Sequence, residues 1–279
     1  MFQKPGVKLF AKMEWQQIGG SLKARAAFNI ISDAFKTGQL GNGRELLDAS
    51  SGNTGIAYAS IARSLGVSIT ICIPANSRDS IKHALRALGV NLIETSKFDS
   101  TDGAREKAAE LASDFPELYF YADQFSNPAN WKAHYYGTAQ EIFLQSKRSV
   151  THFVCSLGTC GTFTGTARGL KAIDPSIKAI ALQPAEMSHP IEGWKHMSSC
   201  MIPKNFDPGL ADSEIEIETW EAYAVMRQAS EEEGLLLSPS AAANLAGAIH
   251  VARELESGVV VTVFPDSIER YQDLIPQVF

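Results

Sequence analysis

Short apolar runs alternate with segments of helical periodicity along most of this chain. Seven runs of six to eight residues are rich in aliphatic and β-branched side chains, namely residues 7–14, 45–50, 68–75, 91–96, 151–156, 177–184 and 259–266. Between them, apolar residues recur at helical spacing in residues 22–35, 53–65, 78–88, 103–115, 131–145 and 164–173. Short apolar strands that alternate with helices predict an α/β fold with mainly parallel sheets covered by helices on both faces.

The stretch from residue 184 to residue 212 interrupts this alternation with four prolines, at positions 184, 190, 203 and 208. Irregular stretches of this length often have a functional role. The chain contains no internal repeat and no low-complexity tract. Its 279 residues, of which 45% are hydrophobic, are enough for two domains with a core each.

Charge and cysteine content exclude several classes of protein. The formal net charge is −6 and no basic block stands out, which argues against a nucleic-acid partner. The cysteines are Cys72, Cys155, Cys160 and Cys200; they form no CxxC pair and no Cys/His metal spacing, so no metal is implied. Cys72 and Cys155 lie in apolar strand patterns and are expected to be buried. With no signal-peptide pattern and no apolar run of membrane-spanning length, we expect a cytoplasmic protein without membrane association.

Three predicted strand-to-helix turns carry chemistry, and the first contains Lys23. This lysine follows a Gly-Gly-Ser turn and begins a predicted helix. The dipole of a helix disfavours a cation at its N-terminus, which costs stability and favours a nucleophilic amine. A solvated surface lysine is the alternative, and for an arbitrary lysine it is the commoner case.

The second turn, DASSGNTGIAYA at residues 48–59, carries a cluster of small polar side chains. Ser50, Ser51, Asn53 and Thr54 surround two glycines just before a predicted helix. Such a cluster can bind a polar ligand. A helix N-cap with a turn is the alternative, and for Ser51 or Asn53 taken singly it is favoured.

The third turn, SLGTCGTFTG at residues 156–165, is glycine-rich and lies between a strand and a helix. Gly158 and Gly161 allow several backbone N–H groups to point at one phosphate, assisted by the helix dipole. Thr159, Thr162 and Thr164 can add hydroxyl donors. The fingerprints of P-loops and dinucleotide-binding folds fit poorly. A plain connecting turn is the alternative.

Together the three turns match what pyridoxal 5′-phosphate requires: an amine for an imine, a polar group for the ring hydroxyl and an anion site. At this point the chain resembles the cysteine synthase family of fold-type II pyridoxal-phosphate enzymes, and within it the B-type branch. The resemblance covers nearly the whole chain. Its anchors, in the family's order, are GGSLKARAA (19–27), SSGNTGIA (50–57), DQFSNPAN (123–130), GTCGTFTG (158–165), LQPAE (182–186), HPIEGW (189–194), SPSAAA (238–243) and VFPDSIERY (263–271).

The resemblance implies a role for each matching residue. Lys23 would form the internal aldimine with the cofactor and act as the proton-transfer base. Asn53 would hydrogen-bond the 3′-oxygen of the ring, and Ser240 would face the pyridine nitrogen. The phosphate would be held by Gly158, Thr159, Cys160, Gly161 and Thr162. The substrate carboxylate would be bound by Ser50, Ser51, Asn53 and Thr54, with Gln124 assisting.

Ser240 has a further chemical consequence in this scheme. A neutral hydroxyl leaves the ring nitrogen unprotonated, which limits the ring as an electron sink and favours β-elimination over transamination. A helix cap within SPSAAANLA is the alternative for Ser240, and both roles can hold at once.

The family's fold is tryptophan synthase β-like, with two domains whose mainly parallel twisted sheets are flanked by helices. Residues 17–130 would form the smaller, mobile domain with the asparagine loop, and residues 1–16 and 131–279 the larger domain with the phosphate cup. The implied activity is β-replacement, in which O-acetyl-L-serine loses acetate, an aminoacrylate remains on the cofactor, and sulfide or thiosulfate adds to give L-cysteine. The resemblance also implies a homodimer.

Several positions depart from the family pattern. The family usually begins with a segment like GNTPL, whereas this chain starts almost at its first strand. Ala24 stands where Asp is usual, and glycine is usual at the positions of Cys160, Ala242 and Ile268. A negative φ angle at Cys160 would accommodate its side chain with little strain.

The substrate-facing stretch 185–197 bears on the leaving group. It contains His189, Lys195 and His196 but no arginine, which would be the better bidentate reader of a phosphate. This slightly favours O-acetylserine over O-phosphoserine.

Two other kinds of function stay open at this point. One is another β-replacement or β-elimination on the same scaffold, by an O-phosphoserine-dependent cysteine synthase, a diaminopropionate or cyanoalanine synthase, or a serine/threonine deaminase. The other is a catalytically poor pyridoxal-phosphate-binding protein with a regulatory role. The departures motivate it, and the intact Lys23, Asn53 and Ser240 argue against it.

Overall fold

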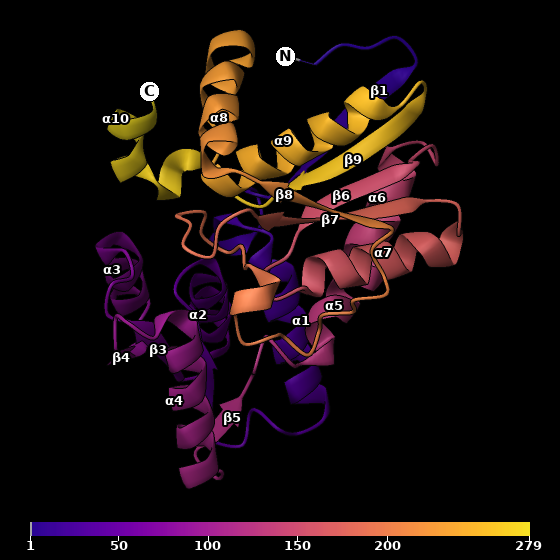
Figure 1. Ribbon diagram of the computed structural model, residues 1–279. Coiled ribbons are helices and arrows are strands. Elements are labelled where there is room, and N and C mark those ends of the chain that lie inside the picture. Colours follow the sequence, from indigo (N-terminus) through magenta and orange to yellow (C-terminus); the bar gives the residue numbers. More distant parts are fainter. Residues whose placement is uncertain (1) are drawn as a thin grey trace. The chain divides into compact units, whose positions relative to one another are not determined.

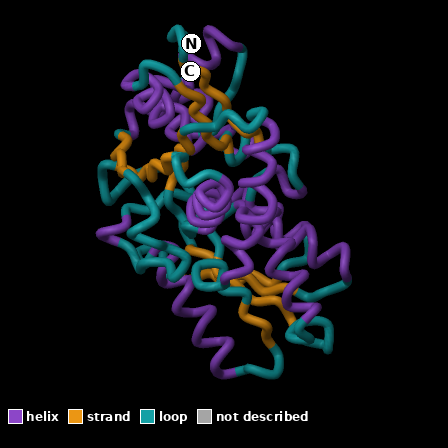
Figure 2. Tube along the Cα trace, turned by 90° about the vertical axis from the view of Figure 1, so that its right-hand side faces the viewer, coloured by secondary structure: helices purple, strands orange, loops and turns teal. Residues whose placement is uncertain are grey.

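The computed structural model describes residues 2–279, and the chain forms two compact units. One unit, here termed the small unit, comprises residues 17–130. The other, termed the large unit, comprises residues 1–16 together with residues 131–279. Each unit is built around its own sheet, with helices on either side of the strands (Figures 1 and 2).

The small unit has a four-stranded sheet in the order β4-β3-β2-β5, and every pair of neighbours is parallel. Its strands are β2 (Glu45–Ala49), β3 (Ile69–Pro74), β4 (Asn91–Thr95) and β5 (Tyr119–Tyr121). Its helices are the 3-10 turn η1 (Ile18–Gly20), α1 (Lys23–Lys36), α2 (Asn53–Leu65), α3 (Asp79–Ala87) and α4 (Ser100–Asp114), and α5 (Pro128–Ala133) begins at its end.

Strand periodicity divides the core of the small unit into two layers. Leu46 and Ile71 pack with α1, α2 and α3, whereas Leu47 and Cys72 pack with Ala104 of α4. Because successive side chains of a strand point to opposite faces, these strands are apolar on both sides. This explains why they appear in the sequence as continuous apolar runs.

The large unit has a five-stranded parallel sheet in the order β1-β9-β6-β7-β8. Its strands are β1 (Val7–Met13), β6 (His152–Ser156), β7 (Lys178–Pro184), β8 (Ser213–Ile217) and β9 (Gly258–Phe264). Its helices are the π-helical segment η2 (His134–Thr138), α6 (Ala139–Gln145), α7 (Gly161–Ile173), η3 (Met197–Ser199), α8 (Thr219–Glu233), α9 (Pro239–Glu254), η4 (Ile268–Arg270), η5 (Gln272–Leu274) and α10 (Ile275–Val278).

Helices α6 and α7 cover one face of this sheet, and α8 and α9 cover the other (Figure 1). Phe153 and Cys155 of β6 point towards α6 and α7, whereas Val154 between them points towards α9. The predicted α/β fold with parallel sheets is therefore confirmed. So is the burial of Cys72 and Cys155, which are 0% and 3% exposed.

The structure adds elements that the apolar pattern does not predict. The seven expected strands are present, but β5 and β8 join them at the edges of the two sheets. The single helix expected over residues 131–145 is interrupted by the π-helical turn η2. The irregular stretch 184–212 contains the short helix η3, and its side chains Ile191 and Trp194 are buried against the large unit's sheet.

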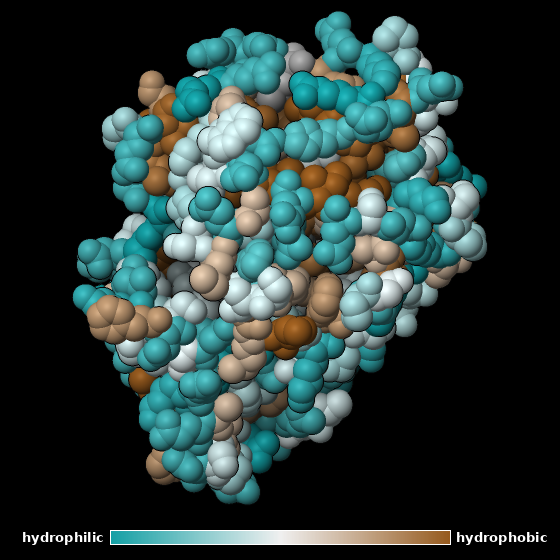
Figure 3. All heavy atoms as spheres, in the orientation of Figure 1, coloured by the Kyte–Doolittle hydropathy of each residue, from teal (hydrophilic) through white to brown (hydrophobic). Residues whose placement is uncertain are grey.

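The surface carries mostly hydrophilic side chains in the orientation of Figure 3, with hydrophobic atoms confined to separate patches. Within residues 2–279, no helix combines the length and the apolar character that a membrane crossing requires.

A buried carboxylate lies next to the end of β2, one of the two central strands of the small unit. Asp48 is 0% exposed; its Oδ1 accepts a hydrogen bond from the N–H of Ala49 at 2.8 Å and its Oδ2 accepts one from the N–H of Gln124 at 3.2 Å. Burial raises the pKa of Asp48 to about 7, the negative charge of Asp123 adds to the rise, and the two N–H groups oppose it.

We predict that replacing Gly165 with alanine destabilises the large unit. A Cβ at Gly165 in α7 would lie 2.0 Å from the carbonyl oxygen of Trp131 and 2.8 Å from Cβ of His134. We expect Gly165→Ala to lower the free energy of unfolding by about 1–3 kcal/mol in urea titrations. The matched control is Gly209→Ala, whose Cβ would find its nearest neighbour at 3.8 Å. Equal stabilities of the two variants would contradict the close packing of α7.

We predict a pH dependence of stability from Asp48. An unfolded chain ionises aspartate near pH 4, roughly, whereas folded Asp48 holds its proton up to about pH 7. The stability from neutral Asp48 is thus fully present below about pH 4 and is lost as the pH rises through about 7. We expect Asp48→Asn to flatten the fall in Tm between pH 5 and 8.

The matched control for this prediction is Asp212→Asn. Burial opposes ionisation of Asp212, but the N–H of Ala179 and two lysines outweigh it and lower its pKa to about 2. Its stabilising effect is therefore present above about pH 4 and is lost only as the pH falls towards 2. The control should keep the wild-type slope between pH 5 and 8, and an unchanged slope in Asp48→Asn would refute the assignment.

Candidate active site

Lys23 is the first residue of α1, as the sequence predicts. The turn before it depends on glycine, because Gly19 and Gly20 both have a φ angle of 72°, in the left-handed region. Ser21 and Leu22 are buried, and Lys23 itself is half-buried. Lys23 therefore belongs to the first turn of a helix, whose N–H groups at Ala24 and Arg25 donate to the carbonyl oxygens of Ser21 and Leu22.

The polar turn of the small unit connects β2 to α2. Its N-cap residue is Gly52, which has no side chain, so N-capping by Ser51 or Asn53 is a wrong interpretation. Ser50 instead satisfies part of the first turn, since its Oγ accepts the N–H of Gly55 at 2.9 Å and that of Gly52 at 3.3 Å. The N-terminal end of α2 carries the partial positive charge of the helix dipole, which favours an anion there.

Gln124 holds this turn in shape. Its Oε1 accepts the Thr54 hydroxyl at 2.8 Å, and its Nε2 donates to the carbonyl oxygen of Ala49 at 2.7 Å. The side chain is buried and joins the carboxyl end of β2 to the first turn of α2. Gln124 and Thr54, which were both predicted as site residues from the sequence, are thus in direct contact.

The glycine-rich turn of the large unit lies between β6 and α7. Cys160, the N-cap residue of α7, has φ 63° and ψ −7°. The negative φ angle that would make a side chain easy to accommodate is therefore not present, and this left-handed conformation explains why glycine is usual here. Gly158 is needed for another reason, because a Cβ there would lie 2.0 Å from the carbonyl oxygen of Gly193.

The threonine hydroxyls of this turn divide into two groups. Thr159 and Thr162 are buried in or beside the first turn of α7. The hydroxyl of Thr164 donates to the carbonyl oxygen of Asn205 at 2.8 Å, so this proton anchors the stretch 184–212 and is not a donor to a phosphate. The expectation of a third threonine donor is wrong.

His134 is a neighbour of the turn that sequence reasoning missed. This buried histidine lies in the π-helical segment η2, and its Nε2 is 3.4 Å from Oγ1 of Thr162. Its Nδ1 is 2.9 Å from Oγ1 of Thr138, one turn further along. No motif marks His134 in the sequence, because only the packing of η2 on α7 brings it to Thr162. Segments of π-helix are frequent at functional sites.

Ser240 is the second residue of α9, and it does not cap that helix. Ser238 is the N-cap, and its Oγ accepts the N–H of Ala241 at 3.2 Å. The Oγ of Ser240 lies 3.2 Å from Oγ of Ser238 and 3.3 Å from Oδ1 of Asp266, a buried residue that follows β9. Asp266 is a second residue that sequence reasoning did not single out.

Asn244 fixes the position of α9 relative to the strands. Its Oδ1 accepts the N–H of Ser156 at the end of β6 at 3.0 Å, and its Nδ2 donates to the carbonyl oxygen of Val263 in β9 at 2.8 Å. Asn244 is fully buried. The helix that carries Ser240 is therefore tied directly to the strand that leads into the glycine-rich turn.

The stretch 185–197 packs on this same turn. The N–H of Lys195 donates to the carbonyl oxygen of Leu157 at 2.8 Å, and Nδ1 of His196 lies 2.8 Å from Oγ of Ser199. Burial lowers the pKa of His189, and the nearby positive groups of His196 and Lys195 add to that shift. His189, Lys195 and His196 thus lie in an ordered segment that packs on the glycine-rich turn of the large unit.

The remaining departures from the family pattern lie in hydrophobic cores. Ala24 packs in the core of the small unit, and Ala242 and Ile268 pack together in a cluster of the large unit that also contains Phe264 and Tyr271. All three substituted side chains are buried. At these three positions this chain has apolar side chains in hydrophobic clusters, where the family usually has aspartate or glycine.

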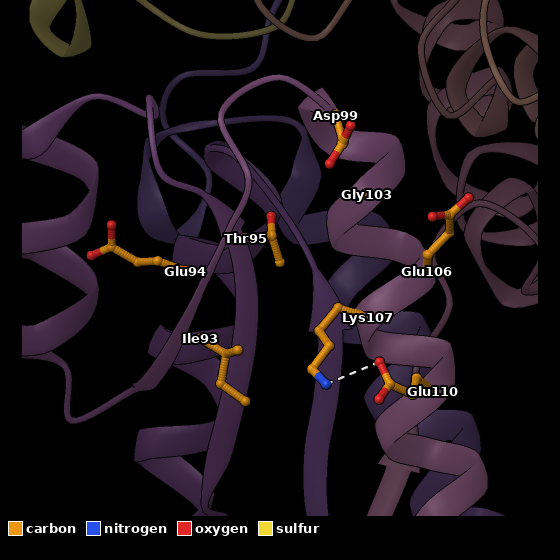
Figure 4. Close-up of a pocket in the computed structure, with 8 residues that line it drawn as sticks. All are labelled: Ile93, Glu94, Thr95, Asp99, Gly103, Glu106, Lys107 and Glu110. Carbon is orange, nitrogen blue, oxygen red and sulfur yellow. Dashed lines mark hydrogen bonds and ion pairs between the residues drawn. The ribbon is translucent and has the colours of Figure 1, made fainter.

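A separate pocket in the small unit is unsuited to an anionic cofactor. It lies between β4 and α4 and is lined by Glu94, Asp99, Glu106 and Glu110, with Lys107 donating to Glu110 at 2.9 Å (Figure 4). Three carboxylates against one lysine repel a phosphate, and the fourth, that of Glu94, pairs with Lys82 at 2.9 Å and with Arg86 at 3.0 Å. None of the predicted site residues lines this pocket.

The donor groups of the two units fit pyridoxal phosphate by their chemistry. The small unit offers a lysine amine in a helix first turn and an asparagine amide at the start of α2. The large unit offers the first-turn N–H groups of α7, buried threonine hydroxyls and the hydroxyl of Ser240. These are an imine partner, a partner for the ring oxygen, donors for a phosphate and a partner for the ring nitrogen.

Comparison with known proteins gives the same answer. The family described as "Pyridoxal-phosphate dependent enzyme" matches residues 1–266. The chain is 44% identical to the cysteine synthase of Aquifex aeolicus, over 95% of this chain and 82% of that protein. It is 36% identical to cysteine synthase B of Escherichia coli K12, over 95% of this chain and 87% of that protein.

A solved structure agrees in fold. The crystal structure of cysteine synthase from Entamoeba histolytica superimposes with a TM-score of 0.91 at 31% identity, and the match covers 98% of this chain and 83% of that one. The chain therefore belongs to the pyridoxal-phosphate-dependent enzymes, and within them to the cysteine synthase family.

Proposed function

We propose that this protein forms L-cysteine by β-replacement, exchanging the acetoxy group of O-acetyl-L-serine for the sulfur of sulfide; with thiosulfate the same exchange gives S-sulfocysteine, which a thiol reductant must then cleave to L-cysteine. The observation that carries the proposal is the complete donor set for pyridoxal phosphate in a chain of the cysteine synthase family. The half-buried amine of Lys23 at the start of α1 is the central element of that set, because it is the nucleophile and the base.

Each group of the donor set has one proposed task toward the cofactor. Lys23 binds its aldehyde carbon, Asn53 its ring oxygen and Ser240 its ring nitrogen. The N–H groups and hydroxyls of the glycine-rich turn hold the phosphate, from Gly158, Thr159, Cys160, Gly161 and Thr162. When bound, pyridoxal phosphate supplies an electron sink that stabilises negative charge at the α-carbon of the substrate.

The N-terminus of α2 is the proposed site of the substrate carboxylate. Ser50, Ser51, Asn53 and Thr54 form or begin this turn, and the helix dipole favours an anion there. The hydrogen bond from Thr54 to Gln124 fixes the turn before substrate arrives, which lowers the entropic cost of binding. In this proposal Gln124 assists by holding the turn.

Lys23 is proposed to move the proton of the reaction. Its amine takes the proton from the α-carbon of the substrate, after which acetate leaves from the β-carbon. Once the sulfur nucleophile has added at the β-carbon, the ammonium group returns the proton to the α-carbon. The half-buried position of Lys23 directly after the glycine turn supports this role.

We further propose that the protein is a cytoplasmic homodimer in which residues 17–130 form the mobile unit. Strand β1 lies at the edge of the five-stranded sheet, and its side chains Phe10 and Met13 are 48% and 55% exposed. An apolar edge strand of this kind is normally covered by a partner. The four cysteines are free thiols, as in a reducing compartment.

We predict that Lys23→Ala removes the visible absorption band of the imine-bound cofactor and lowers turnover at least roughly 100-fold, since both the covalent link and the base are lost. The matched control is Lys36→Ala, at the exposed end of the same helix, which should keep band and turnover. A Lys23→Ala protein with the wild-type band and turnover would eliminate the assignment.

We predict that O-acetylserine changes the absorption spectrum of the holoenzyme and that sulfide restores it with release of cysteine, whereas thiosulfate restores it with release of S-sulfocysteine. O-phosphoserine, added in a parallel titration, should act more weakly, because the stretch 185–197 contains no arginine that could bind its phosphate. A spectrum that responds to O-phosphoserine and ignores O-acetylserine would overturn the choice of substrate.

A further inference from the structure

Asn130 is a buried amide that has no role in the function proposed above. It lies in α5, at the end of the small unit, and is 2% exposed. Its Nδ2 donates to the carbonyl oxygen of Gln124 at 2.6 Å. A carbonyl oxygen only accepts hydrogen bonds, so the amide nitrogen of Asn130 is the atom that faces it. This contact connects α5 to a residue of the candidate site.

Gln124 is held at each of its four polar groups. Its N–H donates to Oδ2 of Asp48 at 3.2 Å, and its carbonyl oxygen accepts from Asn130. Its Nε2 donates to the carbonyl oxygen of Ala49 at 2.7 Å, and its Oε1 accepts the hydroxyl of Thr54 at 2.8 Å. Because the residue is 3% exposed, these protein partners take the place of water.

The two main-chain contacts fix the direction of the Gln124 side chain. Asp48 holds the peptide plane before Gln124, and Asn130 holds the plane after it. Because each peptide unit is planar, two fixed planes determine φ and ψ of the residue between them, and with them the direction of its Cα–Cβ bond. The preceding residue, Asp123, has a φ angle of 41°, in the left-handed region. Such a conformation persists only where the surroundings enforce it.

The Gln124 side chain in turn spans the polar turn of the small unit. Ala49 is the last residue of β2, and Thr54 lies in the first turn of α2. Residues 50–53 therefore form a loop whose two ends are joined by one side chain. A loop that is already fixed loses less entropy when it binds a ligand.

We propose that Asn130 is a positioning residue that acts through Gln124 on residues 50–54 and so sets the affinity for the substrate carboxylate. The inference rests on the proposed binding of that carboxylate at the N-terminus of α2. Without the amide of Asn130, the buried carbonyl oxygen of Gln124 has lost this donor. The peptide after Gln124 then turns towards another donor, and the side chain no longer holds Ala49 and Thr54 together.

The test is the affinity of the holoenzyme for propionate, a carboxylate that has no amino group and forms no imine with the cofactor. NMR titration gives its Kd without turnover. We expect Asn130→Ala to raise this Kd roughly tenfold, since a buried acceptor loses its donor. KM for O-acetylserine should rise by a similar factor while kcat stays within about threefold, because ground state and transition state are bound less tightly alike. A folded Asn130→Ala holoenzyme with the wild-type Kd overturns the proposal.

Asn29→Ala is the matched control. Asn29 in α1 also donates through its Nδ2 to a main-chain carbonyl oxygen of α5, that of Ala129, at 2.7 Å. The control thus removes a hydrogen bond of the same kind, but the partner is not Gln124. We expect it to lower the free energy of unfolding, as Asn130→Ala does, and to keep the wild-type Kd for propionate. An equal rise of Kd in Asn29→Ala would mean that general loosening of the small unit explains the effect, and the proposal would be wrong.

A second substitution serves if the cavity left by Asn130→Ala prevents folding. Asn130→Leu removes the same donor and keeps most of the volume of the side chain. We expect the same rise in the Kd for propionate, and wild-type affinity in this variant contradicts the proposal.

Gln124→Ala separates this inference from the function on which it rests. Because Asn130 acts through Gln124, Asn130→Ala should not raise the Kd of a Gln124→Ala protein any further, and an additional rise in the double variant contradicts the proposed route. If Gln124→Ala itself leaves propionate binding unchanged, the assignment of the carboxylate to this turn fails. If Gln124→Ala weakens binding and Asn130→Ala does not, the role of Asn130 fails alone.

Discussion

Both sheets of this protein are parallel throughout, and parallel neighbours need a crossover connection, which is usually a helix. Helices of this kind begin near the carboxyl ends of the strands, where their first N–H groups have no acceptor. The asparagine turn follows β2 in this way, and the glycine-rich turn follows β6. The position of each anion-binding helix end is thus a consequence of strand direction, and the side chains of the turn decide which anion it can bind.

Buried carboxylates lie beneath these turns in both units. Asp48 lies next to the end of β2 and holds the N–H of Gln124, and Asp266 follows β9 and holds the hydroxyls around Ser240. Burial of a charge is costly unless hydrogen bonds compensate it. In the small unit the cost shows as a raised pKa, and in the large unit the hydroxyls of Tyr271, Ser238 and Ser240 donate to Asp266. Both carboxylates support residues of the candidate site without being part of it.

The sequence predicts the central strands well because they are apolar on both faces, and it also predicts the edge strands β1 and β4, but it misses the edge strands β5 and β8. Strand β8 (SEIEI) lies at a sheet edge with its glutamates exposed, and β5 has three residues, so neither forms an apolar run. The π-helical turn η2 is also missed, since it is a single five-residue turn within a helical stretch. For the candidate site, motifs identify Lys23, Asn53 and the glycine-rich turn, whereas His134 and Asp266 carry no local signal.

By itself, the sequence determined the fold class, the turns that carry chemistry and the family, because each of these depends on residue types at short spacing. The tertiary structure alone decided which groups hold those turns. It showed that Ser238 caps α9 in place of Ser240, that Thr164 is used by Asn205, and that Cys160 adopts a left-handed conformation. Hydrogen-bond partners far apart in the chain and backbone angles are set by packing, and packing is a property of the whole fold that no local pattern encodes.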